Sequence, residues 1–169
     1  MDKSRVSIVL LLALSTLLFS LNRANVSAKD LTEHLFCSWE GFEPDKCASI
    51  WLIKKFVDKE ARFLFVERGE FIEKGIPFDT PDAELRRYSN MSTFESIVKK
   101  YAIKDNAVER IAEIMHDIEI NTWGRKRFKG SQDVIDSVMA IVNQSKSNEE
   151  IIRKCDDYFD GLYKECGSP

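Results

Sequence analysis

The C-terminal half of the sequence carries four apolar patterns with helical spacing, and they constrain the fold more than any other feature. In the second pattern, large apolar residues recur every three or four positions, as on one face of a helix; they are Val108, Ile111, Met115 and Ile118. Two of the patterns open with Ser-x-x-Glu, at Ser92 and Ser147, where both side chains can satisfy backbone N–H groups at a helix start. We therefore expect helices over 92–101, from 106, over 134–142 and over 147–165.

The N-terminal half shows one helical pattern and two short strand patterns. Asp45 can cap a helix that runs to about Val57. Residues 61–66 are aromatic and end in valine, which is typical of a strand, and residues 75–79 form a second short strand or extended turn. Residues 29–44 show neither pattern and are expected to be a lead-in segment. The chain is therefore expected to have an α+β fold, predominantly α-helical, with about five helices and a small sheet of short strands.

The first 28 residues have the three parts of a secretory signal peptide. Two basic residues are followed by an uncharged run from 6 to 21, and residues 26–28 are small enough for a signal peptidase. The alternative is a retained membrane anchor, but a run of 16 residues is shorter than the roughly 20 that span a bilayer. We expect cleavage after Ala28, or after Ala24 as second choice. The mature domain would then cover 29–169, without a stable membrane anchor, and would be periplasmic or secreted.

The charge of the expected mature domain argues against a nucleic-acid partner. Residues 1–28 hold three of the 25 basic and one of the 28 acidic residues, which leaves a net charge near −5. DNA would meet an unfavourable field, so an anion would need a local basic pocket. The sequence also lacks the glycine pattern of dinucleotide sites, the CxxCH of haem attachment and the cysteine spacing of zinc or iron–sulfur sites. We therefore expect neither a cofactor nor a metal.

The expected mature domain contains four cysteines, Cys37, Cys47, Cys155 and Cys166. An even number of cysteines in an oxidising compartment favours disulfides, whereas four buried thiols are the alternative. Cys155 and Cys166 lie on one predicted helix at a separation of about 16 Å, and a disulfide tolerates at most about 7 Å. If all four cysteines are bridged, two connectivities remain. We favour Cys37–Cys166 with Cys47–Cys155 over Cys37–Cys155 with Cys47–Cys166, because Cys47 and Cys155 both lie on core sides of helices.

One stretch carries a family resemblance: D-K-C-A-S-I-W-L-I-K-K-F-V-D at 45–58, followed by A-R-F-L-F-V at 61–66. Further segments follow in order, namely G-I-P-F-D (75–79), E-L (84–85), T-F-E (93–95), H-D (116–117) and F-D-G-L-Y (159–163). Together they resemble the chromate-resistance exported-protein family, which corresponds to the C-terminal domain of ChrB-type proteins. The sequence departs from that family at Arg87, where a histidine is common, and at Ser92, where a cysteine is common. Roles tied to those two residues are therefore not carried over.

The resemblance implies a binding or accessory role in resistance to chromate, a tetrahedral dianion. A helix N-terminus with a nearby lysine or arginine can supply the converging N–H donors that such an anion requires. Lys46 lies in the first turn of the predicted helix, and Arg87 and His116 are further donors. We therefore expect a small oxyanion such as chromate as the ligand. We expect one polar pocket formed by Asp45, Lys46, Asp79, Arg87 and His116.

Other interpretations remain open for the same residues. Lys46 can be a solvated residue at a helix start, and His116 can be a structural histidine with a satisfied partner. The protein can instead be an enzyme of unknown chemistry, with His116 as acid–base or with a redox-active cysteine pair. A third interpretation is an exported domain without a ligand of its own.

Overall fold

The computed structural model describes residues 32–121 and 123–168, and the predicted signal peptide with its cleavage site lies outside them. Within the described part, five α-helices, a π-helical segment and a three-stranded sheet confirm the expected mostly helical fold with a small sheet. The helical elements are α3 (Pro44–Leu52), η1 (Ile53–Val57), α4 (Thr93–Lys100), α5 (Asn106–Glu119), α6 (Lys129–Gln144) and α7 (Asn148–Gly167). The strands are β1 (Leu35–Trp39), β2 (Arg62–Val66) and β3 (Ile76–Pro77).

The sheet is parallel and has the order β2-β1-β3. Both predicted strands are confirmed as β2 and β3. The expectation of a lead-in segment without structure before residue 44 is wrong, because residues 35–39 form the central strand. Phe36, Cys37 and Ser38 are all buried in it, so both faces of the strand are covered and no alternation of apolar and polar residues marks it.

Gly75 allows the short edge strand β3 to pair closely with β1. Its φ is 78°, a left-handed conformation that favours glycine. A Cβ atom at this position would lie 2.5 Å from the Leu35 carbonyl oxygen and 2.9 Å from Cys37 Sγ. Any other residue would therefore push β3 away from the central strand.

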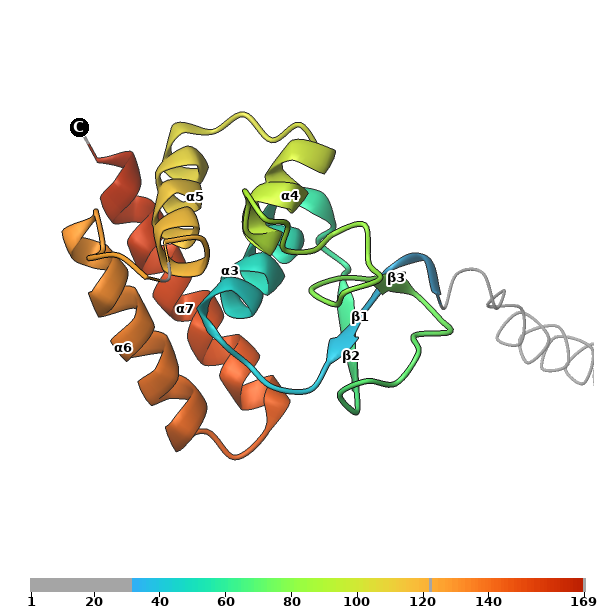
Figure 1. The fold of residues 1–169 in the computed structure, drawn as a ribbon. Coiled ribbons are helices and arrows are strands. Elements are labelled where there is room, and N and C mark those ends of the chain that lie inside the picture. Colours follow the sequence, from blue (N-terminus) through green and yellow to red (C-terminus); the bar gives the residue numbers. More distant parts are fainter. Residues whose placement is uncertain (1–31, 122, 169) are drawn as a thin grey trace, which may run out of the picture. The chain divides into compact units, whose positions relative to one another are not determined.

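Helix α3 is the centre of the domain, and all nine of its residues are buried. It packs against α4, α5, α6 and α7. Figure 1 shows α5, α6 and α7 on one side of α3 and the sheet on the other. The largest fully buried side chains include Trp51 on α3, Phe94 on α4 and Phe159 on α7. Trp51 is thus a core residue.

The start of α3 differs from the prediction. Glu43 is the N-cap, and its carboxylate accepts hydrogen bonds from the backbone N–H groups of Asp45 (2.9 Å) and Lys46 (2.6 Å). The expectation that Asp45 caps this helix is wrong, because the Asp45 carboxylate caps α4. It accepts from the N–H groups of Thr93 (2.7 Å) and Phe94 (3.0 Å). Asp45 therefore joins the starts of two helices.

Helices α4, α5 and α7 begin within one residue of their predicted starts, whereas α6 begins at Lys129, five residues before the predicted start at 134. Ser92 and Glu95 form a full capping box at α4, with the Ser92 N–H donating to the Glu95 carboxylate at 2.7 Å. Ser147 caps α7 by accepting from the Glu150 N–H at 3.3 Å. These caps depend only on residues three positions apart, so they can be read from the sequence.

In the described residues all four cysteines are free thiols, so the expected disulfides are not formed. Cys155 and Cys166 lie on the continuous helix α7, as predicted, and do not pair. The thiols of Cys47 and Cys155 do meet in the core, where the hydrogen bond with Cys155 and burial raise the pKa of Cys47. The preferred partner for Cys37 is wrong: Cys37 lies beside Gly75 in the sheet, whereas the Cys166 carbonyl accepts from Arg110 on α5. A raised pKa disfavours the reactive thiolate, which argues against redox chemistry at Cys47.

Thiol titration should distinguish the four cysteines. In the native protein we expect Cys166, which is half-buried, to react with a thiol reagent at least about 100-fold faster than the three buried cysteines, because those require local opening. After unfolding without reductant, four thiols should be titratable. Two thiols instead of four would show that a disulfide forms in the isolated protein.

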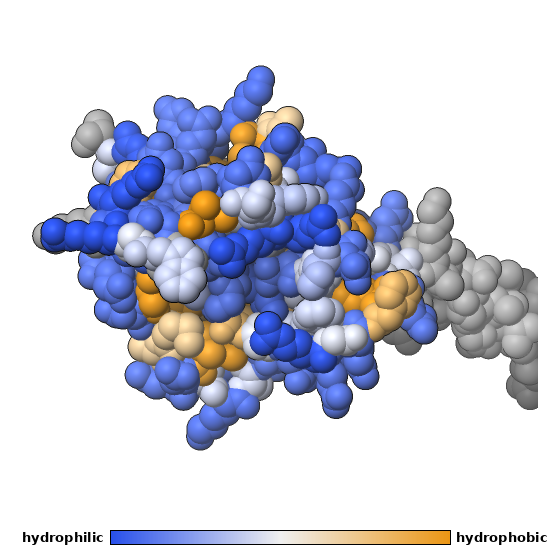
Figure 2. All heavy atoms as spheres, in the orientation of Figure 1, coloured by the Kyte–Doolittle hydropathy of each residue, from blue (hydrophilic) through white to orange (hydrophobic). Residues whose placement is uncertain are grey.

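The surface is mainly polar on the face drawn in Figure 2, where hydrophobic residues form small, separate patches. Among the helices of the described residues, none combines the length and the apolar character that crossing a membrane requires.

Candidate functional site

A cleft of about 990 Å³ lies beside the start of α3. Its walls are the segment that joins β1 to α3, residues 79–89, Arg68, and Glu119 at the end of α5. Four basic and four acidic residues line it, namely Lys46, Arg68, Arg86, Arg87, Glu40, Glu43, Asp79 and Glu119. The cleft thus brings together charged groups from segments that are far apart in the sequence.

Lys46 lines this cleft and is only 4% exposed. Its Nζ atom donates to the carbonyl oxygens of Trp39 and Gly41, each at 2.7 Å, and lies 3.5 Å from the Asp79 carboxylate. An ammonium group has three N–H donors, and these three partners can use all of them. The interpretation of Lys46 as a solvated residue is therefore wrong, and the side chain holds the β1–α3 segment against Asp79.

Asp79 is placed by an uncommon backbone conformation. Its φ is 53°, in the left-handed region that aspartate tolerates better than most residues. Its carboxylate also accepts from the Thr93 hydroxyl at 2.7 Å. Burial raises the pKa of Asp79, although the nearby Lys46 opposes this effect.

The carboxyl groups of Glu43 and Glu119 lie within hydrogen-bonding reach of each other on the cleft wall. Burial raises the pKa of both groups, and the charges of Asp45 and Asp79 raise the pKa of Glu43 further. Asp45, fully buried behind the cleft, also has a raised pKa because of burial and the charges of Asp79 and Glu119. Burial and the neighbouring negative charges together favour the neutral form of Glu43.

Two arginines from the 79–89 segment line the cleft. Arg87 donates to the Glu119 carbonyl oxygen, and its Nη1 atom lies 3.7 Å from the Glu119 carboxylate. Arg86 donates to the Pro81 carbonyl oxygen and lies over the Tyr88 ring, 4.8 Å from its centroid. Each guanidinium has five N–H donors, so both retain donors for a ligand.

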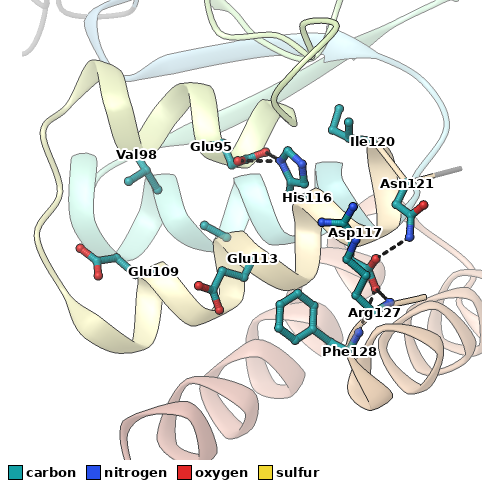
Figure 3. A pocket seen from close by; sticks show the side chains of 11 residues that line it. Glu95, Val98, Glu109, Glu113, His116, Asp117, Ile120, Asn121, Arg127 and Phe128 are labelled. Atoms are coloured by element: carbon teal, nitrogen blue, oxygen red, sulfur yellow. Dashed lines mark hydrogen bonds and ion pairs between the residues drawn. The ribbon is translucent and has the colours of Figure 1, made fainter. Parts of the chain in front are cut away.

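The structure brings together part of the predicted site. Lys46, Asp79 and Arg87 line the one cleft, and Asp45 lies behind it without lining it. The expectation that His116 shares this pocket is wrong, because its side chain lines a second pocket between α4 and α5 (Figure 3). There its Nδ1 atom lies 3.0 Å from Glu95, so this histidine has the partner that the alternative interpretation expected.

Sequence reasoning missed Glu43, Glu119 and Arg68 as cleft residues. Glu43 had a local signal, since an acidic residue directly before a proline is a reasonable helix cap. Glu119 and Arg68 had no such signal, because only the fold brings them to this cleft. Among the described residues, no group of three or more His, Cys, Asp or Glu side chains is arranged to hold a metal ion.

Two of the segments that carry the family resemblance pack directly against each other. The Trp51 Nε1 atom donates to Asp160 at 2.8 Å, and Lys55 forms an ion pair with the same carboxylate. The Lys55 ammonium also lies over the rings of Trp51 and Tyr163, at 5.6 and 5.4 Å from their centroids. These residues join α3 and η1 to α7, so this part of the motif has a structural role.

Comparison with known proteins supports the same assignment as these motifs. Residues 36–166 match the family model described as "ChrB, C-terminal domain". The chain belongs to the ChrB C-terminal domain family. The ChrB C-terminal domain thus accounts for most of this chain, and the resemblance inferred from the motifs is confirmed.

A curated relative of this ChrB C-terminal domain is "Protein ChrB" of Cupriavidus metallidurans (strain CH34). The two sequences are 22% identical over 151 residues, which cover 86% of this chain and 45% of that protein. The chain therefore spans less than half the length of this relative. No solved structure matches the chain.

Proposed function

We propose that this ChrB C-terminal domain binds a small tetrahedral oxyanion such as chromate in the cleft beside α3. It would act as a binding or accessory protein in chromate resistance, outside the cytoplasm. The chromate part of the proposal rests on the family, and the export rests on residues 1–28 alone. The observation that carries the binding role is the convergence of Arg68, Arg86 and Arg87 on one cleft.

The arginines suit an oxyanion because their donors are planar and paired. A guanidinium can donate two parallel hydrogen bonds to two oxygens of the same anion. Arg86 and Arg87 are already oriented by the Pro81 and Glu119 carbonyl oxygens, so little side-chain freedom would be lost on binding. Lys46 contributes positive charge to the cleft, although its donors are used within the protein.

The carboxyl groups on the cleft wall oppose an anion only when they are ionised. Burial raises the pKa of Glu43, Asp79 and Glu119, which favours their neutral form. Each proton taken up by these groups makes the field in the cleft more positive. The arginines remain charged throughout, so the balance of charges in the cleft can favour binding of a dianion.

The double substitution Arg86→Gln/Arg87→Gln should weaken oxyanion binding by at least about tenfold, because it removes two charges with their paired donors. Calorimetric titration with chromate, and with sulfate as a non-oxidising dianion of similar shape, would measure this loss. Arg153→Gln, on exposed α7 surface, is the matched control and should bind like the unchanged protein. If the unchanged protein binds neither anion, or if the double variant binds both as tightly, the proposed function is wrong.

A further inference from the structure

The second pocket, between α4 and α5, has walls of a different kind from the cleft. It measures about 610 Å³, within the size range of small-molecule sites. Figure 3 shows it along α5, with Phe128 from the start of α6 at one side and Val98 from α4 at the other. Apolar side chains form much of the surface; they are Val98, Ala112, Ile120 and Phe128. The pocket can therefore cover an apolar body.

His116 provides an oriented acceptor in this pocket. Its Nδ1 atom lies 3.0 and 3.1 Å from the two oxygens of the Glu95 carboxylate. Glu95 is itself held by the Ser92 N–H at 2.7 Å, as part of the capping box of α4. A carboxylate can only accept, so Nδ1 carries the hydrogen of this bond, and in the tautomer that the bond selects Nε2 presents a lone pair. The dyad thus offers an acceptor nitrogen backed by a negative charge.

The charges around the pocket are mainly negative. Glu95, Glu109 and Glu113 contribute three carboxyl groups, and Arg127 contributes the single guanidinium among the lining residues. Asp117 also lines the pocket, but its oxygens already accept hydrogen bonds from Arg127, Phe128, Ser131 and Asn121. An anion would be repelled here, whereas a cation would gain charge-assisted hydrogen bonds.

We propose that this pocket is a second ligand site, which binds a small organic ammonium compound with an apolar, preferably aromatic, body. The ammonium group would donate to Glu113 and to the His116–Glu95 dyad, and the apolar body would pack against Val98 and Phe128. A primary ammonium has three N–H donors, so it can donate to several separate acceptors of this pocket at the same time. This site does not depend on oxyanion binding in the cleft, because none of the residues invoked here lines the cleft.

Three probes of similar shape test the proposal: 2-phenylethylamine as the cation, 2-phenylethanol as the neutral analogue and 3-phenylpropionate as the anion. In two-dimensional amide NMR, the amine should give saturable shifts in α4, α5 and residue 128, and should bind at least about tenfold more tightly than either analogue. Glu109→Gln/Glu113→Gln should remove this preference for the amine. Glu149→Gln, an exposed acidic residue at the start of α7, is the control and should retain it.

Several results would overturn the proposal. The alcohol could bind as tightly as the amine, the shifts could map to the arginine cleft, or millimolar amine could cause no shift. The substituted glutamates are exposed on α5, so the variants should fold, and thermal melting followed by circular dichroism would verify this. Sulfate binding by the same variants should be unchanged, which separates failure of this site from failure of the proposed function.

Discussion

Lys46→Met is expected to lower the free energy of unfolding by about 3–5 kcal/mol, as for other buried charges whose partner is removed. The carbonyl oxygens of Trp39 and Gly41 would lose their buried donor, and the Asp79 carboxylate would lose its nearest cation. From the sequence alone, Lys46 is either a ligand residue or a solvated residue at a helix start, and in both cases its truncation is expected to leave the domain folded. The buried hydrogen bonds change that expectation to a large loss of stability.

Urea unfolding at neutral pH measures the effect of this substitution. Lys99→Met is the matched control, because Lys99 is exposed in the last turn of α4, and the change should stay within about 0.5 kcal/mol. A Lys46→Met protein as stable as the control would mean that the ammonium group does not hold the β1–α3 segment.

Asp117→Asn is expected to destabilise the protein by about 3 kcal/mol at neutral pH, through the loss of charged hydrogen bonds. Helix α6 has no side-chain cap from its own N-cap residue, Phe128. Asp117 on α5 instead holds the chain that enters α6, by accepting from the N–H groups of Arg127 (2.8 Å) and Phe128 (3.2 Å) and from the Ser131 hydroxyl (2.8 Å). An asparagine keeps one acceptor oxygen but turns an NH₂ group toward the other donors.

The difference in stability between the unchanged protein and Asp117→Asn should depend on pH, with a defined sign. Burial by itself would raise the pKa of Asp117, but the hydrogen bonds from Asn121, Arg127, Ser131 and Phe128 outweigh it and hold the pKa well below its usual range. A lowered folded-state pKa stabilises the protein above the unfolded value, about 3.9, and this contribution is lost as the pH falls toward the folded value. The gap between the unchanged protein and Asp117→Asn should therefore be constant above about pH 5 and shrink below about pH 4.

Urea unfolding across this pH range would measure the gap, with Asp133→Asn on the exposed side of α6 as the control. The control should differ from the unchanged protein by no more than about 0.5 kcal/mol. A gap that widens in acid would contradict the assignment of a lowered pKa to Asp117.

The helical part of the fold could be predicted because its signals are local. The stripe on α5 and the serine caps of α4 and α7 depend on residues three or four positions apart. Strand β1 could not be predicted in the same way. It is a five-residue strand buried on both faces, so its sequence shows no alternation that distinguishes it from an irregular segment.

The sequence by itself determined the approximate positions of the helices, the serine caps of α4 and α7, and the family, because these depend on short-range patterns or on ordered motifs. Only the tertiary structure decided what the charged residues do. Asp45 caps a helix that starts 48 positions later, and Lys46 is buried against carbonyl groups of the preceding loop. His116 pairs with Glu95 in a pocket separate from Arg87. A buried charged group must pair with polar groups that lie near it in the folded structure. Here those groups come from distant segments, which no local sequence pattern identifies.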